Sequence, residues 1–507
     1  MPMEPRPLLA SLRRHALPGA ALVVLALALF ARAVGFDFVR YDDHELLVLQ
    51  QHSLLRPSFV VGAFWQDAFG VLGPEAKGHF YRPLLIASYA LDAQLAGGEP
   101  AHFHATNLAL HLGATLLAYA LFIAFGSSRA LAFALAAVFC CHPAAALVVA
   151  WVPCRNDSLL AITCIASVLA LLAWLRDGRR SALALCVAAY AAALFTKESG
   201  GALLAVLVGI ALVTPRRNGA RRDLAYAAAA SLVVTAAWAG MRFLVLGGTR
   251  LGTARVSGNL SGLLVYLGKT FAPVDLAVIP HPEDTALWPG LVALALLAPA
   301  VASLGHRLWG PAGIGLLWYG AFLLPSLFVP PGTWGLEHRI YLPLVGMLLF
   351  VSRLGEGFAR RLPARLGIAA LLAAAALFAI ATARRLPDFS GPIAYWEAAT
   401  RSSPHSDLAA SRLAWRYYEA SRFEAAIAAA DRALALDGDQ PGLYLLRGAS
   451  AATMGDWRSA ERDFEQAVAR EPENAEAWEQ LARVQRRLGQ EQQSRESRRR
   501  AASLRGR

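Results

Sequence analysis

The sequence predicts an all-α protein with two parts. These are a polytopic membrane domain of about eleven transmembrane helices over residues 1–384 and a soluble α-solenoid over residues 385–507. Hydrophobic residues make up 56% of the 507 and charged residues only 17%, a composition too apolar for an ordinary soluble domain. Long apolar stretches recur through the first part, and a fixed 34-residue period marks the second.

Eleven apolar stretches approach the ~20 residues that a helix needs to span a bilayer. They lie near 17–34, 104–125, 129–148, 157–175, 181–196, 200–214, 222–246, 286–304, 311–329, 339–354 and 366–384. The first follows Arg6 and is interpreted as a retained anchor, because further spans come after it. The stretch 258–280 is interpreted as re-entrant or as lying along the membrane, since a full span there would invert the later basic loops.

Arginines cluster in alternate loops, and the positive-inside rule assigns these loops to the cytoplasm. They are Arg13/Arg14, Arg129, Arg176/Arg179/Arg180, Arg216/Arg217/Arg221/Arg222, Arg307 and Arg360/Arg361/Arg365. The amino terminus is then cytoplasmic and residues 385–507 are outside. Arginine supplies almost all of the positive charge and alanine is abundant, which is typical of a GC-rich bacterial genome. We therefore predict a bacterial inner-membrane protein with a periplasmic tail. The net charge of +12 is interpreted as a sign of membrane topology and not of nucleic-acid binding.

The tail contains an internal repeat. Phe389, Phe423 and Trp457 are 34 residues apart, and Pro404, Gly438 and Pro472, Ala426/Ala460 and Ala433/Ala467 keep the same period. This period, with small residues packing two helices, resembles the tetratricopeptide repeat. It predicts a leading half-repeat (389–404), two full repeats and an incomplete third, with 495–507 as a solvated or fraying helix. Such repeats bind polypeptides, whereas the alternative is a small packed cap on the membrane domain.

The predicted first outer loop, 35–103, opens with the adjacent acids Asp42 and Asp43. Placing carboxylates beside a bilayer costs free energy, so such residues usually have a functional role. The alternative is structural, because aspartate is a favoured N-cap and a helix beginning near His44 would be capped by this pair.

Short polar motifs occur at the predicted outer ends of later spans. They are Tyr81-Arg82-Pro83-Leu84, His104-x-x-Asn107-x-x-x-His111, His142-Pro143 followed by Arg155-x-Asp157, Lys197-Glu198-x-Gly200, and Glu337-His338-Arg339-x-Tyr341-Leu342-Pro343. In this order, between the acid pair and the repeats, they resemble the transmembrane-and-tetratricopeptide-repeat O-mannosyltransferases and their bacterial relatives, within the GT-C superfamily. The resemblance covers residues 36–480 and rests on the number and order of the motifs.

The resemblance implies an inverting sugar transfer from a polyprenyl-phosphate donor at the outer membrane face. Such a transfer needs a carboxylate that takes the proton of the acceptor hydroxyl, and cations that hold the leaving phosphate. By the family pattern either Asp42 or Asp43 is the base. Arg155, Lys197 and Arg339 are the candidate donor-phosphate ligands, with interfacial snorkelling as their alternative.

Seven further residues of these motifs are expected to support the site: Arg82, His104, Asn107, Glu198, Glu337, His338 and Tyr341. His104, Asn107 and His111 share one helical face, and we favour polar packing between helices for them over a metal site. Cys140, Cys141, Cys154, Cys164 and Cys186 show no metal-ligand spacing. No metal site or cofactor is therefore assigned, although a divalent ion is compatible with the acid pair.

We therefore expect a membrane glycosyltransferase that moves a sugar, with mannose suggested by the resemblance, to a hydroxyl acceptor such as a protein Ser or Thr. Its partners would be the lipid-linked sugar, membrane lipid and an acceptor or partner polypeptide bound by the repeats. The first alternative is a non-catalytic, membrane-anchored scaffold or assembly factor. A transporter is less favoured, because the ionisable residues gather at one face and not at the bilayer midplane.

Overall fold

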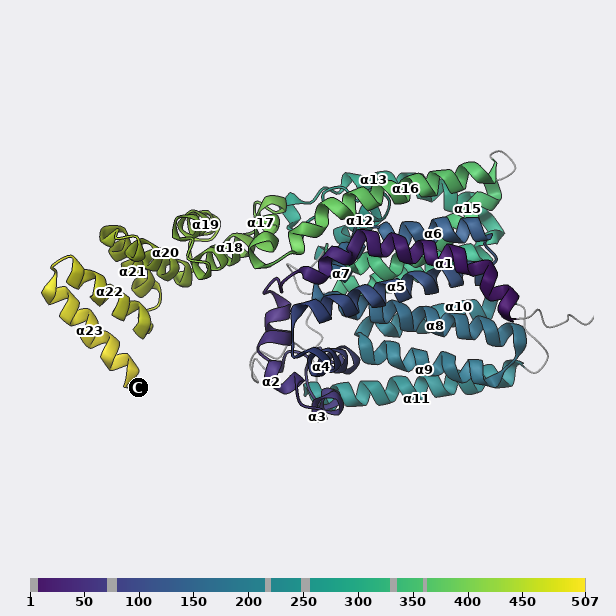
Figure 1. Ribbon diagram of the computed structural model, residues 1–507, viewed down its shortest axis with the longest axis horizontal. Coiled ribbons are helices and arrows are strands. Elements are labelled where there is room, and N and C mark those ends of the chain that lie inside the picture. Colours follow the sequence, from purple (N-terminus) through teal and green to yellow (C-terminus); the bar gives the residue numbers. More distant parts are fainter. Residues whose placement is uncertain are drawn as a thin grey trace, which may run out of the picture. The chain divides into compact units, whose positions relative to one another are not determined.

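The computed structural model describes residues 8–70, 80–214, 220–247, 256–328, 335–358 and 363–506. Arg6, which precedes the first apolar stretch, lies outside these residues, as do Arg216, Arg217, Arg360 and Arg361 of the predicted basic loops. The chain divides into two compact units, unit 1 (Met1–Leu276 and Ala286–Gly391) and unit 2 (Ala277–Thr285 and Pro392–Arg507). Every regular element in the described ranges is helical (Figure 1), so the predicted all-α class is confirmed.

Each predicted apolar stretch falls on a helix of unit 1. Within the described residues, seven spans are long and apolar enough to cross a membrane, or eight if the bent pair α6–α7 forms one span. They correspond largely to α1 (Leu8–Phe30), α5 (Pro100–Ala124), α8 (Arg155–Asp177), α11 (Ala220–Leu246), α13 (Trp288–Leu304), α14 (Pro311–Leu323) and α16 (Ala364–Arg385), and the pair is α6 (Arg129–Cys141) with α7 (Ala144–Ala150).

Three other predicted spans correspond to α9 (Arg180–Thr196), α10 (Leu203–Val213) and α15 (Tyr341–Phe358). The stretch 258–280 is not one continuous helix, because α12 (Val256–Phe271) ends well before residue 280. The total of eleven spans and the side on which each loop lies stay predictions.

The helices of unit 1 pack as a layered bundle. α11 lies on α9, α9 on α8 and α8 on α5, while α1 and α16 both pack against α6 (Figure 1). Gly315 of α14 and Gly346 of α15 allow these two helices to approach closely, because a Cβ at Gly315 would lie 2.5 Å from the Gly346 carbonyl oxygen. Large apolar side chains such as Leu244, Leu296 and Leu377 are exposed on the outer helices, as expected of a bundle surrounded by lipid.

The segment between α1 and α5 folds into a small helical layer with its own apolar core. Its elements are η1 (Ala31–Gly35), η2 (His44–Val48), α2 (Gln51–Leu54), α3 (Ser58–Gly62), η3 (Ala63–Trp65) and α4 (Pro83–Ala96). Leu46 and Leu47 of η2 pack with Tyr89 of α4 and with Phe103 and Val152 from the bundle. This core fixes the chain that follows Asp43 against the ends of α5 and α8.

Unit 2 consists of α17 (Pro392–Ser402) followed by three helical pairs: α18 (Asp407–Glu419) with α19 (Phe423–Leu436), α20 (Pro441–Thr453) with α21 (Trp457–Arg470), and α22 (Ala475–Arg487) with α23 (Glu491–Arg505). The alanines of the 34-residue period, Ala426, Ala433, Ala460 and Ala467, are all buried.

The third repeat of unit 2 is more complete than predicted. Ser494 and Ser497 of α23 are buried, and the Ser494 hydroxyl donates to the Ala482 carbonyl at 2.7 Å. Helix α23 is therefore packed against α22 and is not a solvated extension. The short segment Ala277–Thr285 also belongs to this unit, where Ser403 donates to the Ile279 carbonyl at 2.6 Å.

Candidate functional site

The second acid of the pair, Asp43, holds a tight backbone turn. Its carboxylate oxygens accept hydrogen bonds from the backbone amides of Val39 and Tyr41, each at 2.7 Å. Between these two residues Arg40 has a φ of +55°, a left-handed conformation that costs energy for a residue with a side chain. Asp43 is 1% exposed. Its side chain makes no capping bond to η2, so helix capping does not explain Asp43.

The first acid, Asp42, has a different environment. It is partly exposed, and its carboxylate has no hydrogen-bond partner among the residues that the structure describes. Burial, followed by the negative charges of Asp43 and Glu45, raises the pKa of Asp42 to about 7, while the charge of Arg82 acts in the opposite direction. Burial also raises the pKa of Asp43, to about 6, against the lowering effect of its backbone hydrogen bonds.

Two of the predicted cations form ion pairs beside this turn. Arg82 binds Glu198 at 3.0 Å at the start of α4, and Glu198 also accepts from the Tyr81 amide at 3.2 Å. Lys197, which follows α9, binds the Asp157 carboxylate at 2.6 Å. These two pairs come from neighbouring residues of one motif, so the Lys197-Glu198 segment joins the first outer loop to the start of α8.

His338 of η10 (Glu337–Ile340) lies where the acid loop and the late motif meet. The Tyr41 ring stacks on Trp151 with centroids 5.8 Å apart, and Trp151 meets the His338 ring edge-on at 6.2 Å. Burial lowers the pKa of His338 well below its usual value, and the positive charges of Lys197, Arg339 and Arg82 lower it further. The structure therefore brings these three cations and the acid loop to one place.

Arg339 is the cation of this group with most of its hydrogen-bonding capacity unused. The single hydrogen bond of its side chain in the described part of the chain joins Nη1 to the Tyr266 hydroxyl at 3.4 Å. The side chain is partly exposed. A guanidinium offers five N–H donors in a planar fork that suits a phosphate, so Arg339 can take an anionic ligand without losing an ion pair.

Arg155 behaves differently from what the sequence predicts. It is fully buried, with Nη2 2.5 Å from Asp92 Oδ2 and 2.9 Å from the Phe103 carbonyl, and Nε donating to Asn107 at 2.7 Å. Its Nη1 donates to the Ser88 carbonyl at 3.2 Å. A phosphate contact would break this network, so the structure assigns Arg155 to holding α4, α5 and α8 together.

The remaining polar residues of α5 also bond within the bundle. Asn107 donates to the Val148 carbonyl at 3.3 Å, and His104 is buried with its ring edge-on to Phe36. His111 Nε2 lies 3.2 Å from the Cys140 carbonyl and Nδ1 lies 2.7 Å from the Tyr341 hydroxyl. A carbonyl can only accept, so Nε2 carries the proton and Nδ1 accepts from Tyr341.

Glu337 lies in a buried ion triad with partners that the sequence analysis did not single out. Its carboxylate is 2.8 Å from Lys269 of α12 and also pairs with Arg385 at the end of α16. All three residues are nearly inaccessible to solvent. The sequence did not identify Lys269 as a partner of Glu337 or Asp92 as a partner of Arg155. Each is a lone charge within an apolar stretch, and this signal could have found them.

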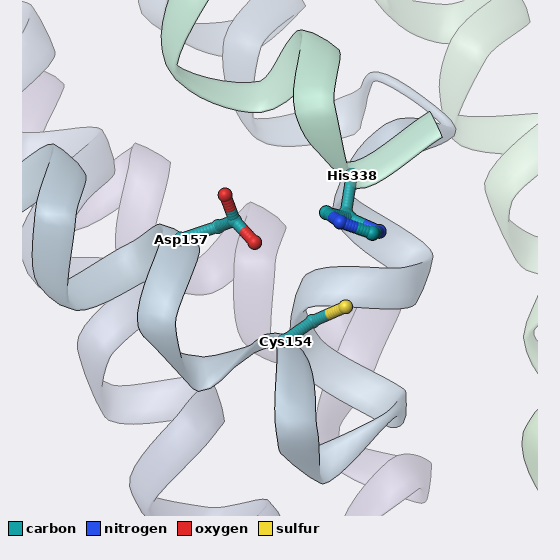
Figure 2. A group of neighbouring side chains, drawn as sticks. All are labelled: Cys154, Asp157 and His338. Carbon is teal, nitrogen blue, oxygen red and sulfur yellow. The ribbon is translucent and has the colours of Figure 1, made fainter. Parts of the chain in front are cut away.

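One group of side chains offers ligand atoms for a metal ion. Cys154, Asp157 and His338 are all buried, and their ligand atoms lie within 4.8 Å of one another (Figure 2). No metal site was predicted from the sequence, because the cysteines show no metal-ligand spacing, and this group forms only when His338 is brought to Cys154 and Asp157 by the fold.

Comparisons with known proteins agree with this architecture. Residues 441–484 match the tetratricopeptide repeat family. The chain is 32% identical over 168 residues to protein O-mannosyl-transferase TMTC1 of Mus musculus, and 33% identical over 167 residues to the Homo sapiens protein of the same name. Each match covers 32% of this chain but only 17% and 18% of the two relatives. The resemblance predicted from the motif order, and the membrane and repeat character of the chain, are thereby confirmed.

Proposed function

We propose that this protein is an inverting membrane glycosyltransferase of the GT-C type. It moves a sugar, mannose by analogy with the similar proteins, from a polyprenyl-phosphate donor to a hydroxyl acceptor such as a protein Ser or Thr. The observation that carries the proposal is that Arg82 acts on the carboxylate of Asp42 and also, together with Lys197 and Arg339, on the neighbouring His338. A base and several cations are what the transfer chemistry requires.

The two acids have separate roles in this proposal. Asp42 is the general base, because its carboxylate has no hydrogen bond in the described residues and its pKa of about 7 suits proton transfer near neutral pH. Asp43 is a positioning residue, since both of its oxygens bind the backbone of the turn. The proton of the acceptor hydroxyl passes to Asp42 as the acceptor oxygen attacks the anomeric carbon and the bond to the phosphate oxygen breaks.

Arg339 and Lys197 bind the phosphate of the donor, and Arg82 adds positive charge while its pair with Glu198 holds it in place. Arg155 is not part of this set, because its buried network fixes the three helices around the site. The protein would lie in a bacterial inner membrane with its amino terminus in the cytoplasm. The repeats would bind the acceptor or a partner polypeptide in the periplasm.

The test compares cell-surface and periplasmic glycans in a deletion strain that carries the wild-type gene, Asp42→Asn or Asp43→Asn. We expect loss of one glycan in the deletion and in Asp42→Asn, with restoration by the wild type. The scaffold alternative holds instead if deletion and both substitutions leave every glycan unchanged while removal of residues 392–507 has a phenotype.

A further inference from the structure

Cys154, Asp157 and His338 form a compact buried cluster at one end of the bundle. Their ligand atoms lie within 4.8 Å of one another, and Figure 2 shows the thiol, the carboxylate and the imidazole directed toward a common space. In the ranges that the structure describes, no other group of three such residues meets this geometry.

The local fold explains why these side chains meet. Cys154 ends η5 (Val152–Cys154) and Asp157 lies in the first turn of α8, three residues later, so both project from the same face. His338 reaches them from η10, with its ring against Trp151. Two rigid helix ends therefore supply the three groups.

Two atoms of the cluster are buried without a hydrogen bond in the described structure. They are Asp157 Oδ2 and His338 Nδ1, and both residues are more than nine-tenths buried. The other carboxylate oxygen of Asp157 binds Lys197. Buried polar atoms are almost always satisfied, and an exception points to a missing water or ion. Here two exceptions from separate segments face one space.

We propose that Cys154, Asp157 and His338 bind a divalent cation of the zinc class. A thiolate, an imidazole and a carboxylate are the ligands that zinc prefers, whereas magnesium and calcium favour oxygen alone. Zinc bonds of about 2.0–2.3 Å place tetrahedral ligand atoms roughly 3.3–3.8 Å apart, so the cluster needs to close only slightly. Three protein ligands leave a fourth position for water or an oxygen ligand.

The charges of the surroundings are compatible with such an ion. The thiolate and the carboxylate balance a divalent charge, and the imidazole binds in its neutral form. Lys197, Arg82 and Arg339 are the nearby cations. Lys197 and Arg82 each already have a carboxylate partner, Asp157 and Glu198 respectively, and the partly exposed Arg339 is bound to the Tyr266 hydroxyl. Lys197 occupies only Oδ1 of Asp157, so Oδ2 stays available to the metal.

The experiment measures metal content and does not use transferase activity. The full-length protein is purified in detergent, stripped with a chelator and titrated with Zn²⁺ and Co²⁺. The variants are Cys154→Ser and Asp157→Asn, and the matched control is Cys164→Ala, which removes a different buried cysteine, in α8. Size-exclusion chromatography and thermal unfolding without metal report whether each variant is folded.

We expect about one zinc per wild-type chain and per Cys164→Ala chain, and binding weakened at least about 100-fold in Cys154→Ser, since even supporting residues of metal sites contribute 10- to 100-fold. Co²⁺ should give a thiolate charge-transfer band that Cys154→Ser lacks, and Zn²⁺ should raise the melting temperature of the wild type but not of this variant. Equal zinc content in wild type and Cys154→Ser, or no zinc bound by the wild type, overturns the proposal.

Discussion

The backbone amide of Tyr41 donates to the carboxylate of Asp43 over 2.7 Å, and this bond fixes the turn on which Asp42 is presented. The two adjacent acids therefore differ in whether their carboxylate oxygens are free to bind other groups. Both carboxylate oxygens of Asp43 accept hydrogen bonds from the backbone. Asp42 keeps its carboxylate without a hydrogen bond in the described structure, and this difference separates two residues that the sequence treats alike.

Substitution of Asp42 by Asn should abolish transfer without harming the fold. Loss of a general base typically costs about 10²–10⁴-fold in rate. Burial raises the pKa of Asp42 from its ordinary value of 3.8 to about 7, so the folded protein favours the protonated carboxyl group. The contribution of Asp42 to the free energy of unfolding is therefore fully present below pH 3.8 and is lost as the pH rises through 7. At pH 8 the variant should melt no lower than the wild type. A variant that is inactive because it unfolds would contradict this role.

The pH profile should report the same carboxyl group. Because a base acts when deprotonated, kcat/KM should fall as the pH drops, with a midpoint near 7. The negative charge of Glu45 helps to raise the pKa of Asp42, so Glu45→Gln should move the midpoint to lower pH while the plateau rate stays unchanged. A midpoint that is the same in both proteins would assign the titration to another group.

Arg339 should contribute chiefly to binding of the donor. Its guanidinium has one hydrogen bond, to Tyr266, in the described residues, and hydrogen bonds to charged groups contribute about 1.5–3 kcal/mol. We expect Arg339→Ala to lower kcat/KM for the lipid-linked donor roughly 10- to 100-fold, with a smaller loss in Arg339→Lys. The exposed Arg307 gives the control, since Arg307→Ala should leave donor kinetics unaltered. Equal effects at both positions would indicate a general charge effect.

The fold was largely predictable from the sequence because apolar length and a 34-residue period are local signals. The ion-pair partners of the charged residues were not predictable in this way, because they lie far apart in the sequence. The sequence grouped Arg155 with the donor-binding cations because it lies in a recognisable motif, but Asp92, on a different helix, makes it a buried structural residue. In the same way, only the packing of η10 against the start of α8 brings His338 to Cys154. Such long-range partners depend on how helices pack, which periodicity does not encode.

The buried triad around Glu337 should matter more for stability than the partly exposed pair Arg82–Glu198. Glu337→Gln removes the carboxylate charge that pairs with the buried Lys269 and Arg385, and breaking a buried pair costs about 3–5 kcal/mol. Side chains in the Arg82–Glu198 pair are 16% and 26% exposed, so Glu198→Gln should cost about 1 kcal/mol or less. Thermal unfolding of both variants checks which substitution destabilises the protein more. A smaller drop in melting temperature for Glu337→Gln than for Glu198→Gln would refute the prediction.

The close packing of the second full repeat can be tested with a pair of glycines on α20. A Cβ at Gly448 would lie 2.9 Å from the Phe464 ring of α21, well inside van der Waals contact. Overpacking of this kind costs typically about 1–3 kcal/mol. A Cβ at Gly442, in the first turn of the same helix, would meet Trp415 at an ordinary 3.9 Å.

Gly448→Ala should therefore speed hydrogen exchange of the α20 and α21 amides in the full-length protein. Gly442→Ala should leave it unchanged or slow it, because alanine favours a helix over glycine by up to about 1 kcal/mol. The two substitutions add the same methyl group to the same helix, so helix propensity alone would shift both in the stabilising direction. Protection that falls only in Gly448→Ala would show that the contact with Phe464 determines how closely the two helices of this repeat pack.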